Sequence, residues 1–463
     1  MFQRRITSVC RVQDVIIGGD NPIRIQSMTN TNTNDIEGSV AQIERIVDAG
    51  ADIVRLTAQG TREAMSLKEI EAGIHRDGYQ VPLVADIHFN AAVADVAAGI
   101  VEKVRINPGN YVDPGRTFKK LEYTDEEYAQ EIQKIRARLV PFLNICKEHH
   151  TAVRIGVNHG SLSDRIMSRY GDTPAGMVES CMEFLRICVE EDFMDVVISI
   201  KASNCVVMVR TMRLLVEAMD KEDMHFPLHL GVTEAGEGED GRIKSAVGIG
   251  ALLCEGIGDT IRVSLSEAPE REIPVARKLV EMIPECATLR EECKKAIVDD
   301  TITLSLNEPD MESLQLKASM TVGALLIDGL AHKLVIQNPG FTQEQLVDLA
   351  DSILQAARVK FTRTEFISCP GCGRTLYDLE ETIARIKAAV KEAAKTDPKF
   401  STLKIGIMGC IVNGPGEMAD ADYGYVGAGP GKVSLYKGKQ CIEKNIPTEG
   451  AVEKLLEFIR NDQ

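Results

Sequence analysis

The sequence predicts an α/β protein in which an N-terminal (β/α)8 TIM barrel, a short insert and a C-terminal α/β domain follow one another. Three observations predict this fold class. Strand-like and helix-like patterns alternate eight times between residues 23 and 265, the alternation is lost in the next stretch, and a new Gly- and Pro-rich composition begins at 361. Repeated strand–helix alternation is typical of a parallel barrel. We assign the three domains to residues 1–285, 286–360 and 361–463.

The barrel is expected to begin after a hairpin. Residues 9–19 alternate and run into the turn sequence Gly-Gly-Asp-Asn-Pro, which is a hairpin signal. Eight runs rich in β-branched residues follow, with helical patterns such as 39–51 and 175–191 between most of them. These runs are 23–28, 52–57, 82–87, 103–108, 152–157, 195–201, 227–232 and 260–265. A doubly wound open sheet is the alternative, but no GxGxxG follows the first run.

The stretch 286–360 lacks the regular strand–helix alternation, but part of it is similar in sequence to the end of the barrel. GALLCEGIGDTIRV at 250–263 is similar to GALLIDGLAHKLVI at 323–336, although the Arg of the first copy is Val335 in the second. We interpret 286–360 as an inserted, shrunken barrel-like piece without catalytic side chains. A chance similarity between two helix–strand units is the alternative.

The last hundred residues predict a compact α/β domain. A loop with two cysteines precedes a long amphipathic pattern, and the buried strand LKIGIMGC runs into NGPGE. Two more short strands follow, and AVEKLLEFIRN predicts a closing helix.

Composition narrows the function classes. The net charge of −16 argues against a nucleic-acid surface, because phosphate backbones recruit basic patches. No apolar run approaches a membrane span, and the N-terminus has no hydrophobic signal core, so we expect a cytoplasmic protein without a membrane partner. Twelve cysteines in a long cytosolic chain do not indicate disulfides.

Three cysteines stand apart from the other nine, which we interpret mostly as buried small hydrophobic residues. Cys369 and Cys372 form a CxxC in CPGCGRT, and Cys410 lies in MGCIVNGPGE. The Gly and Pro residues disfavour helix there and expose N–H groups. We predict an iron–sulfur cluster whose last iron takes an oxygen ligand, and Glu417, seven residues after Cys410, is placed to supply it.

Other interpretations of these cysteines remain open. Cys441 is the competing fourth ligand, although no turn glycine stands directly beside it. A structural zinc site needs four protein ligands, and no fourth Cys or His adjoins Cys410. A thioredoxin-like CxxC needs no remote third cysteine.

A second constellation lies at the carboxyl ends of the predicted barrel strands, where active sites of this fold lie. Five strands carry a cation there, namely Arg55, Arg105, Arg154, Lys201 and Arg262. One such cation is usually a solvated surface charge, but five at equivalent positions inside apolar strands need anionic partners. Converging Arg and Lys side chains suit a diphosphate.

Further polar residues accompany the cations. Neutral donors for the same anion are Asn107, Asn158, Ser161, Ser203 and Ser264. Candidates for proton donation, or for holding the cations in place, are Asp86, His88, His229 and Glu234.

Together these stretches resemble the 4-hydroxy-3-methylbut-2-en-1-yl diphosphate synthase family of the non-mevalonate isoprenoid pathway. The similarity covers nearly the whole chain except 286–360. The stretches that carry it are IQSMTNT, ADIHFNAAVA, KVRINPGN, RIGVNHGSLSDRI, KASN, LHLGVTEAGEGEDGRIKSAVGIGALL, GDTIRVSLSE, CPGCGRT and MGCIVNGPGE. The chain is similar to the longer subtype, but its middle region is much shorter.

The resemblance implies a barrel joined to a [4Fe–4S] iron–sulfur domain with Cys369, Cys372, Cys410 and Glu417 as ligands. It implies that 2-C-methyl-D-erythritol 2,4-cyclodiphosphate is reductively opened and dehydroxylated with two electrons from ferredoxin or flavodoxin. It also implies a homodimer in which one subunit's cluster domain caps the other's barrel. Within this chemistry we predict Glu234 as the protonating acid and His88 and Asp86 as second choices.

Two other functions are compatible with the residues alone. A non-redox iron–sulfur dehydratase would use the open iron only to polarise a hydroxyl group. A non-catalytic electron carrier or iron sensor would have no use for five barrel cations.

Overall fold

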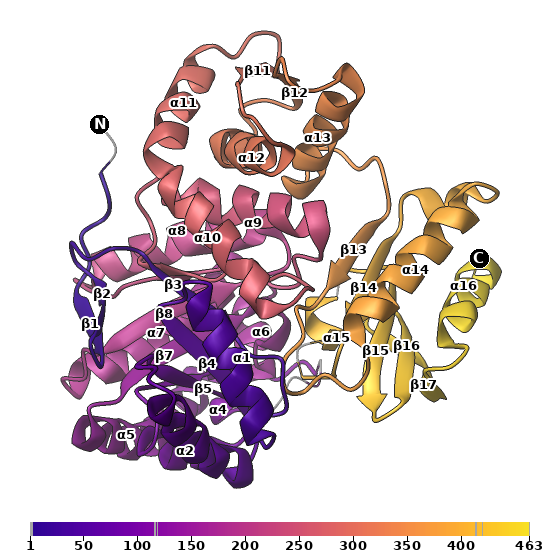
Figure 1. The fold of residues 1–463 in the computed structure, drawn as a ribbon. Helices are drawn as coiled ribbons and strands as arrows, with labels where there is room; N and C mark the ends of the chain where they lie inside the picture. The colour runs from indigo at the N-terminus through magenta and orange to yellow at the C-terminus, as the bar shows by residue number, and fades with distance from the viewer. Residues whose placement is uncertain (1–2, 115–116, 118, 413, 419, 463) are drawn as a thin grey trace.

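A computed structural model describes residues 3–114, 117, 119–412, 414–418 and 420–462. Three bodies are visible in Figure 1: the barrel, a small middle segment above it, and a C-terminal domain beside the barrel mouth.

The N-terminal body is the predicted (β/α)8 barrel. It follows an antiparallel hairpin of β1 (Val9–Val12) and β2 (Val15–Gly18). Its eight strands are β3 (Arg24–Met28), β4 (Ile53–Ala58), β5 (Leu83–Ile87), β6 (Lys103–Ile106), β7 (Ala152–Asn158), β8 (Val196–Lys201), β9 (His229–Leu230) and β10 (Thr260–Ile261). All pair in parallel in the order β8-β7-β6-β5-β4-β3-β10-β9, and a bridge from Ile198 to Leu228 joins the two ends. All eight predicted strands are therefore present.

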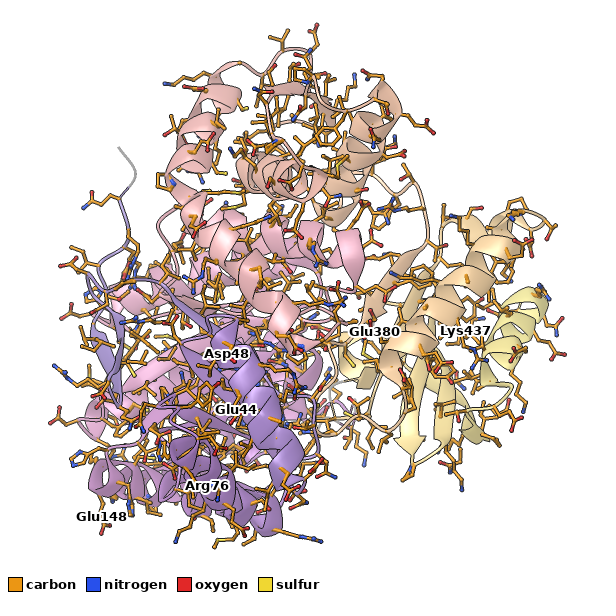
Figure 2. All side chains as sticks on the ribbon, in the orientation of Figure 1. Glu44, Asp48, Arg76, Glu148, Glu380 and Lys437 are labelled. Atoms are coloured by element: carbon orange, nitrogen blue, oxygen red, sulfur yellow. The ribbon has the colours of Figure 1, made fainter. Side chains whose placement is uncertain are left out.

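Helices cover the outside of the barrel. The main ones are α1 (Ile36–Asp48), α2 (Thr61–Arg76), α3 (Ala91–Ala98), α5 (Asp125–His149), α7 (Pro174–Glu190), α8 (Cys205–Lys221), α9 (Gly238–Leu253) and α10 (Glu272–Glu281). Shorter turns are α4 (Pro108–Tyr111), η1 (His159–Ser161), α6 (Asp164–Tyr170) and η2 (Pro269–Arg271). Helix α1 is typical, because Asp35 caps Gly38 N–H, Ile43 and Ile46 are buried, and Asp48 is exposed. Figure 2 labels Glu44 and Asp48 on this helix.

The hairpin seals the bottom of the barrel. Its buried side chains pack on the first inward-facing residues of four strands and form an apolar plug. The plug consists of Cys10, Val12 and Ile17 from the hairpin and of Ile53, Val84, Ala152 and Val197 from the strands. The barrel is therefore open only at its carboxyl-terminal mouth, as this fold requires of an active-site face.

The middle segment is a small helix–strand–helix–strand–helix unit. It comprises α11 (Ile283–Lys295), β11 (Thr301–Ser305), α12 (Met311–Ile327), β12 (Lys333–Gln337) and α13 (Gln343–Ala356), and its two strands pair in parallel. The predicted start of the insert at 286 falls inside α11.

The repeated GALL sequence lies where the middle segment contacts the barrel. It ends α9 in the first copy and α12 in the second, and the two helices pack on each other. Gly250 of α9 lies against Met320, and Gly323 of α12 lies against Val247. Gly250 and Gly323 are equivalent in the repeat, as are Val247 and Met320, so the two helices make reciprocal contacts.

The C-terminal domain is a five-stranded sheet covered by helices. Its strands are β13 (Glu365–Ser368), β14 (Lys404–Met408), β15 (Tyr423–Gly429), β16 (Lys432–Lys437) and β17 (Gln440–Pro447), in that spatial order. The first three are parallel and the last two antiparallel. Its helices are α14 (Leu379–Ala394), η3 (Pro398–Ser401), α15 (Gly414–Glu417) and α16 (Ala451–Asn461).

No helix in the described part of the chain is long and apolar enough to span a bilayer.

The α9–α12 contact yields a first prediction. A Cβ atom at Gly250 would lie 2.5 Å from Met320 Cγ and 3.0 Å from its Cα, so Gly250→Val should force the helices apart. We expect a loss of about 1–3 kcal/mol in the free energy of unfolding, measured by calorimetry. Gly340→Val is the control, because that glycine is exposed and its Cβ would have no close contact. Equal losses in both variants would contradict the packing argument.

Candidate active site

The five predicted cations converge at the mouth of the barrel. Arg55, Arg105, Arg154 and Lys201 lie on β4, β6, β7 and β8, and Arg262 follows β10. None is more than 8% exposed, and all five line one cavity. The same cavity is lined by Asp86, His88, Asn158, Glu234 and Ser264 from the barrel and by Cys369, Cys372 and Cys410 from the C-terminal domain. Two constellations that are far apart in the sequence thus form one site.

The positive charge of this site is incompletely neutralised. Arg262 pairs with Glu272 at 3.0 Å, whereas Arg55, Arg154 and Lys201 have no carboxylate within 4.0 Å in the described part of the chain. Burial, and then the neighbouring cations, lowers the pKa of Arg154 and Lys201 well below the ordinary values. Orphaned donors include Arg105 Nε and the Nε and one terminal NH2 group of Arg154. A bound anion would relieve both the repulsion and the missing hydrogen bonds.

Asp86 does not have the environment of a proton donor. One carboxylate oxygen accepts from Arg105 at 2.8 Å and the other accepts from Arg374 at 2.8 Å. Burial alone would raise the pKa of Asp86, but the surrounding arginines outweigh burial and hold it well below its usual range. Asp86 therefore links the barrel to the C-terminal domain as an anion, and this environment does not favour it as the proton donor.

His88 is also unsuited to carry a proton. Its Nε2 contacts Arg105, and its Nδ1 lies 3.1 Å from the Asn110 amide nitrogen. Burial, reinforced by the charge of Arg105, lowers the pKa of His88 well below its ordinary value. This environment disfavours the protonated imidazole and does not favour His88 as the proton donor.

Glu234, unlike Asp86 and His88, lies in an environment that favours its protonated form. Its backbone adopts the left-handed region with φ 51°, a strained conformation for a non-glycine residue that is characteristic of functional sites. It lines the cavity, and its Oε2 has no partner in the described structure. Burial raises the pKa of Glu234 to about 7, against the opposing effects of Thr233, Lys201 and Arg262.

The three cysteines come together because of the sheet topology. Cys369 follows β13 and Cys410 comes two residues after β14, and these strands are parallel neighbours whose carboxyl ends share one edge. Cys372 lies in the loop after β13, and α14 begins only at Leu379, unlike a thioredoxin-type CxxC at a helix start. Cys441 lies on β17, three strands from β14, which is roughly 14 Å at ordinary strand spacing. It is therefore not a neighbour of the other three.

The cysteine set fits a cluster better than a single ion. No group of three His, Cys, Asp or Glu residues within the described ranges is arranged to hold one metal ion. A cluster spreads its thiolates over separate irons, and its sulfur atoms accept hydrogen bonds from backbone N–H groups. Gly409 N–H donates to Cys369 Sγ at 3.2 Å, and Gly371 at φ 76° allows the loop to turn between Cys369 and Cys372. The donor chemistry therefore agrees with an iron–sulfur group bound by three cysteines.

Glu417 lies beside the cavity and is held by the barrel. Its carboxylate accepts from Gly160 N–H at 3.2 Å and from the Thr233 hydroxyl at 3.1 Å, and its carbonyl accepts from Ser203. Burial, and then the charge of Glu234, raises the pKa of Glu417 well above its ordinary value. Ligation of iron by Glu417 stays a prediction.

Four other predicted residues do not line the cavity. Asn107 caps Gly109 N–H and donates to Ser161 Oγ, so these two side chains bond to each other. Ser203 holds Glu417, and the fully buried His229 lies one layer deeper, 3.3 Å from Thr260 Oγ1. Their direct contact with substrate remains a prediction.

The C-terminal domain caps the barrel of its own chain. Gly416 approaches Gly160 so closely that a Cβ on either would overlap the other's backbone. Ser266 donates to the Cys369 carbonyl at 2.9 Å, and Ala235 and Ser368 form a parallel bridge. Both halves of the site thus occur in one chain, whereas the sequence analysis expected a homodimer whose subunits share it.

Arg374 is the main residue that the sequence reasoning missed. Its guanidinium is buried, lines the cavity and joins Asp86 to the loop that bears Cys372. The signal was present, because Arg374 lies in CPGCGRT, but its sequence position does not reveal a partner on β5. Met28 and Thr233 also line the cavity and were not singled out.

Fold and site together define a TIM-barrel enzyme for an anionic substrate, closed by a cap that bears three clustered thiols. The comparisons with known proteins agree. Residues 7–277 match the family model described as the GcpE TIM-barrel domain, and residues 365–461 match the GcpE protein C-terminal domain. The chain belongs to this family, that of the 4-hydroxy-3-methylbut-2-en-1-yl diphosphate synthases.

Curated relatives match over the whole chain. A 4-hydroxy-3-methylbut-2-en-1-yl diphosphate synthase (flavodoxin) of Bacteroides thetaiotaomicron is 53% identical, with 100% of this chain and 98% of the relative covered. The protein of the same name from Phocaeicola vulgatus is 51% identical, with 99% and 98% covered. The first alignment spans 610 positions whereas this chain has 463 residues, so the relatives carry segments without a counterpart here.

The Arg374–Asp86 pair yields a second prediction. Arg374→Met should loosen the cap by about 1–3 kcal/mol, less than an isolated buried pair because Arg105 still neutralises Asp86. Amide hydrogen exchange of 369–375 and 414–418 should accelerate roughly 5- to 150-fold. The matched control is Arg385→Met on α14. Arg385 is half exposed, and its ion pair with Glu453 is weak because the two groups are 3.9 Å apart. Unchanged exchange in Arg374→Met would show that the pair does not hold the cap.

Proposed function

We propose that this chain catalyses the two-electron reductive ring opening and dehydroxylation of 2-C-methyl-D-erythritol 2,4-cyclodiphosphate to (E)-4-hydroxy-3-methylbut-2-enyl diphosphate. The observation that carries the proposal is one cavity lined by five barrel cations and by Cys369, Cys372 and Cys410. The names of the relatives support the same reaction.

The cations would bind the diphosphate. Arg55, Arg154 and Lys201 lack carboxylate partners in the described structure, so they are free to pair with phosphate oxygens. Asn158 and Ser264 line the same cavity and offer neutral hydrogen bonds. The diphosphate thereby orients the carbon skeleton toward the cap, where the thiols lie.

The three cysteines would hold a [4Fe–4S] cluster, with Glu417 as the oxygen ligand in the resting state. When bound, this group supplies electrons one at a time and an iron that accepts a substrate oxygen. Glu417 is close enough to the barrel rim to be held by Gly160 and Thr233 when it is not a ligand.

Glu234 would deliver the proton that the departing hydroxyl group requires. It lines the cavity between the cations and the cysteines and has an oxygen without a protein partner. Asp86 accepts hydrogen bonds from two arginines, and His88 contacts Arg105. Neither residue is therefore as well suited as Glu234 to donate the proton.

Partners and compartment follow from the same chemistry. We infer that flavodoxin, or ferredoxin in its place, donates the electrons, since the relatives' names include flavodoxin. None of the twelve cysteines forms a disulfide in the described structure, which supports a reducing compartment such as the cytoplasm. A homodimer is compatible with the fold, but each chain would carry a complete site.

Turnover tests the proposed reaction. Under anaerobic conditions the loaded enzyme should convert the cyclic diphosphate only with reduced flavodoxin or ferredoxin. Glu234→Gln should lower kcat by about 100- to 10,000-fold while the cluster spectrum is retained. Activity without a reductant would instead support an iron–sulfur dehydratase, and full activity of Glu234→Gln would remove it as the acid.

Mixing two inactive variants tests the one-chain site. Lys201→Met disables the barrel half and Cys369→Ser disables the cap half. If each chain builds its own site, a co-expressed mixture stays inactive. A sizeable return of activity, relative to each variant mixed with itself, would show that the cap of one subunit serves the barrel of another.

A further inference from the structure

Arg374 is a buried cation of the C-terminal domain to which the proposed reaction assigns no chemical role. It lies two residues after Cys372 in the same loop. Its side chain lines the cavity together with Cys369, Cys372 and Cys410, and only 7% of the residue is exposed. The five cations at the barrel mouth come from the barrel, whereas Arg374 belongs to the segment that bears the thiols.

One nitrogen of Arg374 lacks a hydrogen-bond partner. A terminal NH2 group donates to Asp86 Oδ2 at 2.8 Å, but the Nε has no acceptor in the described structure. Buried polar atoms in native proteins are almost always paired, so this N–H group points to an acceptor that is bound in the cavity. The sulfur atoms of an iron–sulfur cluster are such acceptors, and hydrogen bonds to them raise or lower its reduction potential.

Charge near the thiols matters because reduction makes their surroundings more negative. In the proposed function flavodoxin gives up one electron and the cluster gains it, so the cluster and its ligands together gain one negative charge. Arg374 interacts electrostatically with Cys372 and Cys410. A nearby cation attracts the reduced form more strongly than the oxidised form, because the attraction grows with the charge. The charge of Arg374 therefore favours reduction.

Asp86 does not cancel this effect. It accepts hydrogen bonds from Arg105 and from Arg374, each at 2.8 Å, so two guanidinium groups share one carboxylate. Two cations and one anion leave one net positive charge. The ion pair thus holds the guanidinium of Arg374 in place without neutralising the group as a whole.

We propose that Arg374 is a redox-tuning residue, whose charge and unpaired N–H group raise the reduction potential of the cluster and make its reduction by flavodoxin more favourable. The inference rests on the proposed function, because it requires a cluster on Cys369, Cys372 and Cys410. It gives Arg374 a role beyond the ion pair that links the C-terminal domain to the barrel.

An anaerobic redox titration followed by paramagnetic resonance tests this role without turnover. The reconstituted full-length protein is titrated without substrate, and Arg374→Gln is compared with the unaltered protein. Gln can still donate to Asp86 but carries no charge. At a fixed solution potential we expect the ratio of reduced to oxidised cluster to fall about tenfold, which corresponds to a potential about 59 mV lower for one electron.

The sign of the shift separates charge from structure. A C-terminal domain that is merely loosened admits water, which stabilises the more highly charged, reduced form and raises the potential. An unchanged or raised potential in Arg374→Gln would therefore overturn the proposal. Arg374→Lys keeps the charge and should retain most of the unaltered ratio. A fall as large as that of Arg374→Gln would show that charge is not the cause and would overturn the proposal as well.

Two further variants complete the test. Arg374→Met is a second neutral replacement, and its potential should also fall, so it replaces Arg374→Gln if that variant assembles too little cluster. Arg385→Gln makes the same change on α14, where the arginine is half exposed, and should leave the potential unchanged. An equal fall in Arg385→Gln would count against a specific effect of Arg374. An unaltered protein that assembles no cluster would overturn the proposed function and this inference with it, whereas normal turnover with an unchanged potential in Arg374→Gln would overturn this inference alone.

Discussion

Buried positive charge is the constraint on which the rest of this structure depends. Five cations lie at the barrel mouth, and three of them lack carboxylate partners within the described residues. Such an arrangement is unfavourable in an empty protein, because burial and mutual repulsion oppose the charged forms. It becomes favourable when an anion binds. The folded barrel therefore holds the cations in an arrangement that favours diphosphate binding.

The attachment of the C-terminal domain to the barrel mouth also depends on this buried positive charge. Asp86 accepts from Arg105 within the barrel and from Arg374 of the C-terminal domain, so one carboxylate neutralises a ring cation and joins the two bodies. Around the mouth, Gly160 and Gly416 allow backbone contact that larger residues would prevent. The cap therefore brings the three thiols to the cavity that the cations line, where both can act on one substrate.

The middle segment explains how a single chain can build this site. Its helix α12 packs on α9 of the barrel through reciprocal glycine contacts, and α13 leads into β13. Glu365 at the start of β13 pairs with Lys244 of the barrel and with Arg358 of the segment. Three bodies therefore meet at one buried carboxylate, which fixes the start of the cap relative to the barrel mouth.

The sequence by itself determined the local chemistry. Strand and helix periods identified all eight barrel strands, and the ends of those predicted strands pointed to the five cations. Residue type and spacing singled out Cys369, Cys372 and Cys410. Only the tertiary structure decided the partners. Whether a carboxylate is paired depends on contacts between segments that are distant in the sequence. Asp86 forms an ion pair with Arg374 of the C-terminal domain, whereas Glu234 has an unpaired oxygen in the described structure. Cys441 was separated from the other thiols by sheet order, which spacing along the chain does not encode.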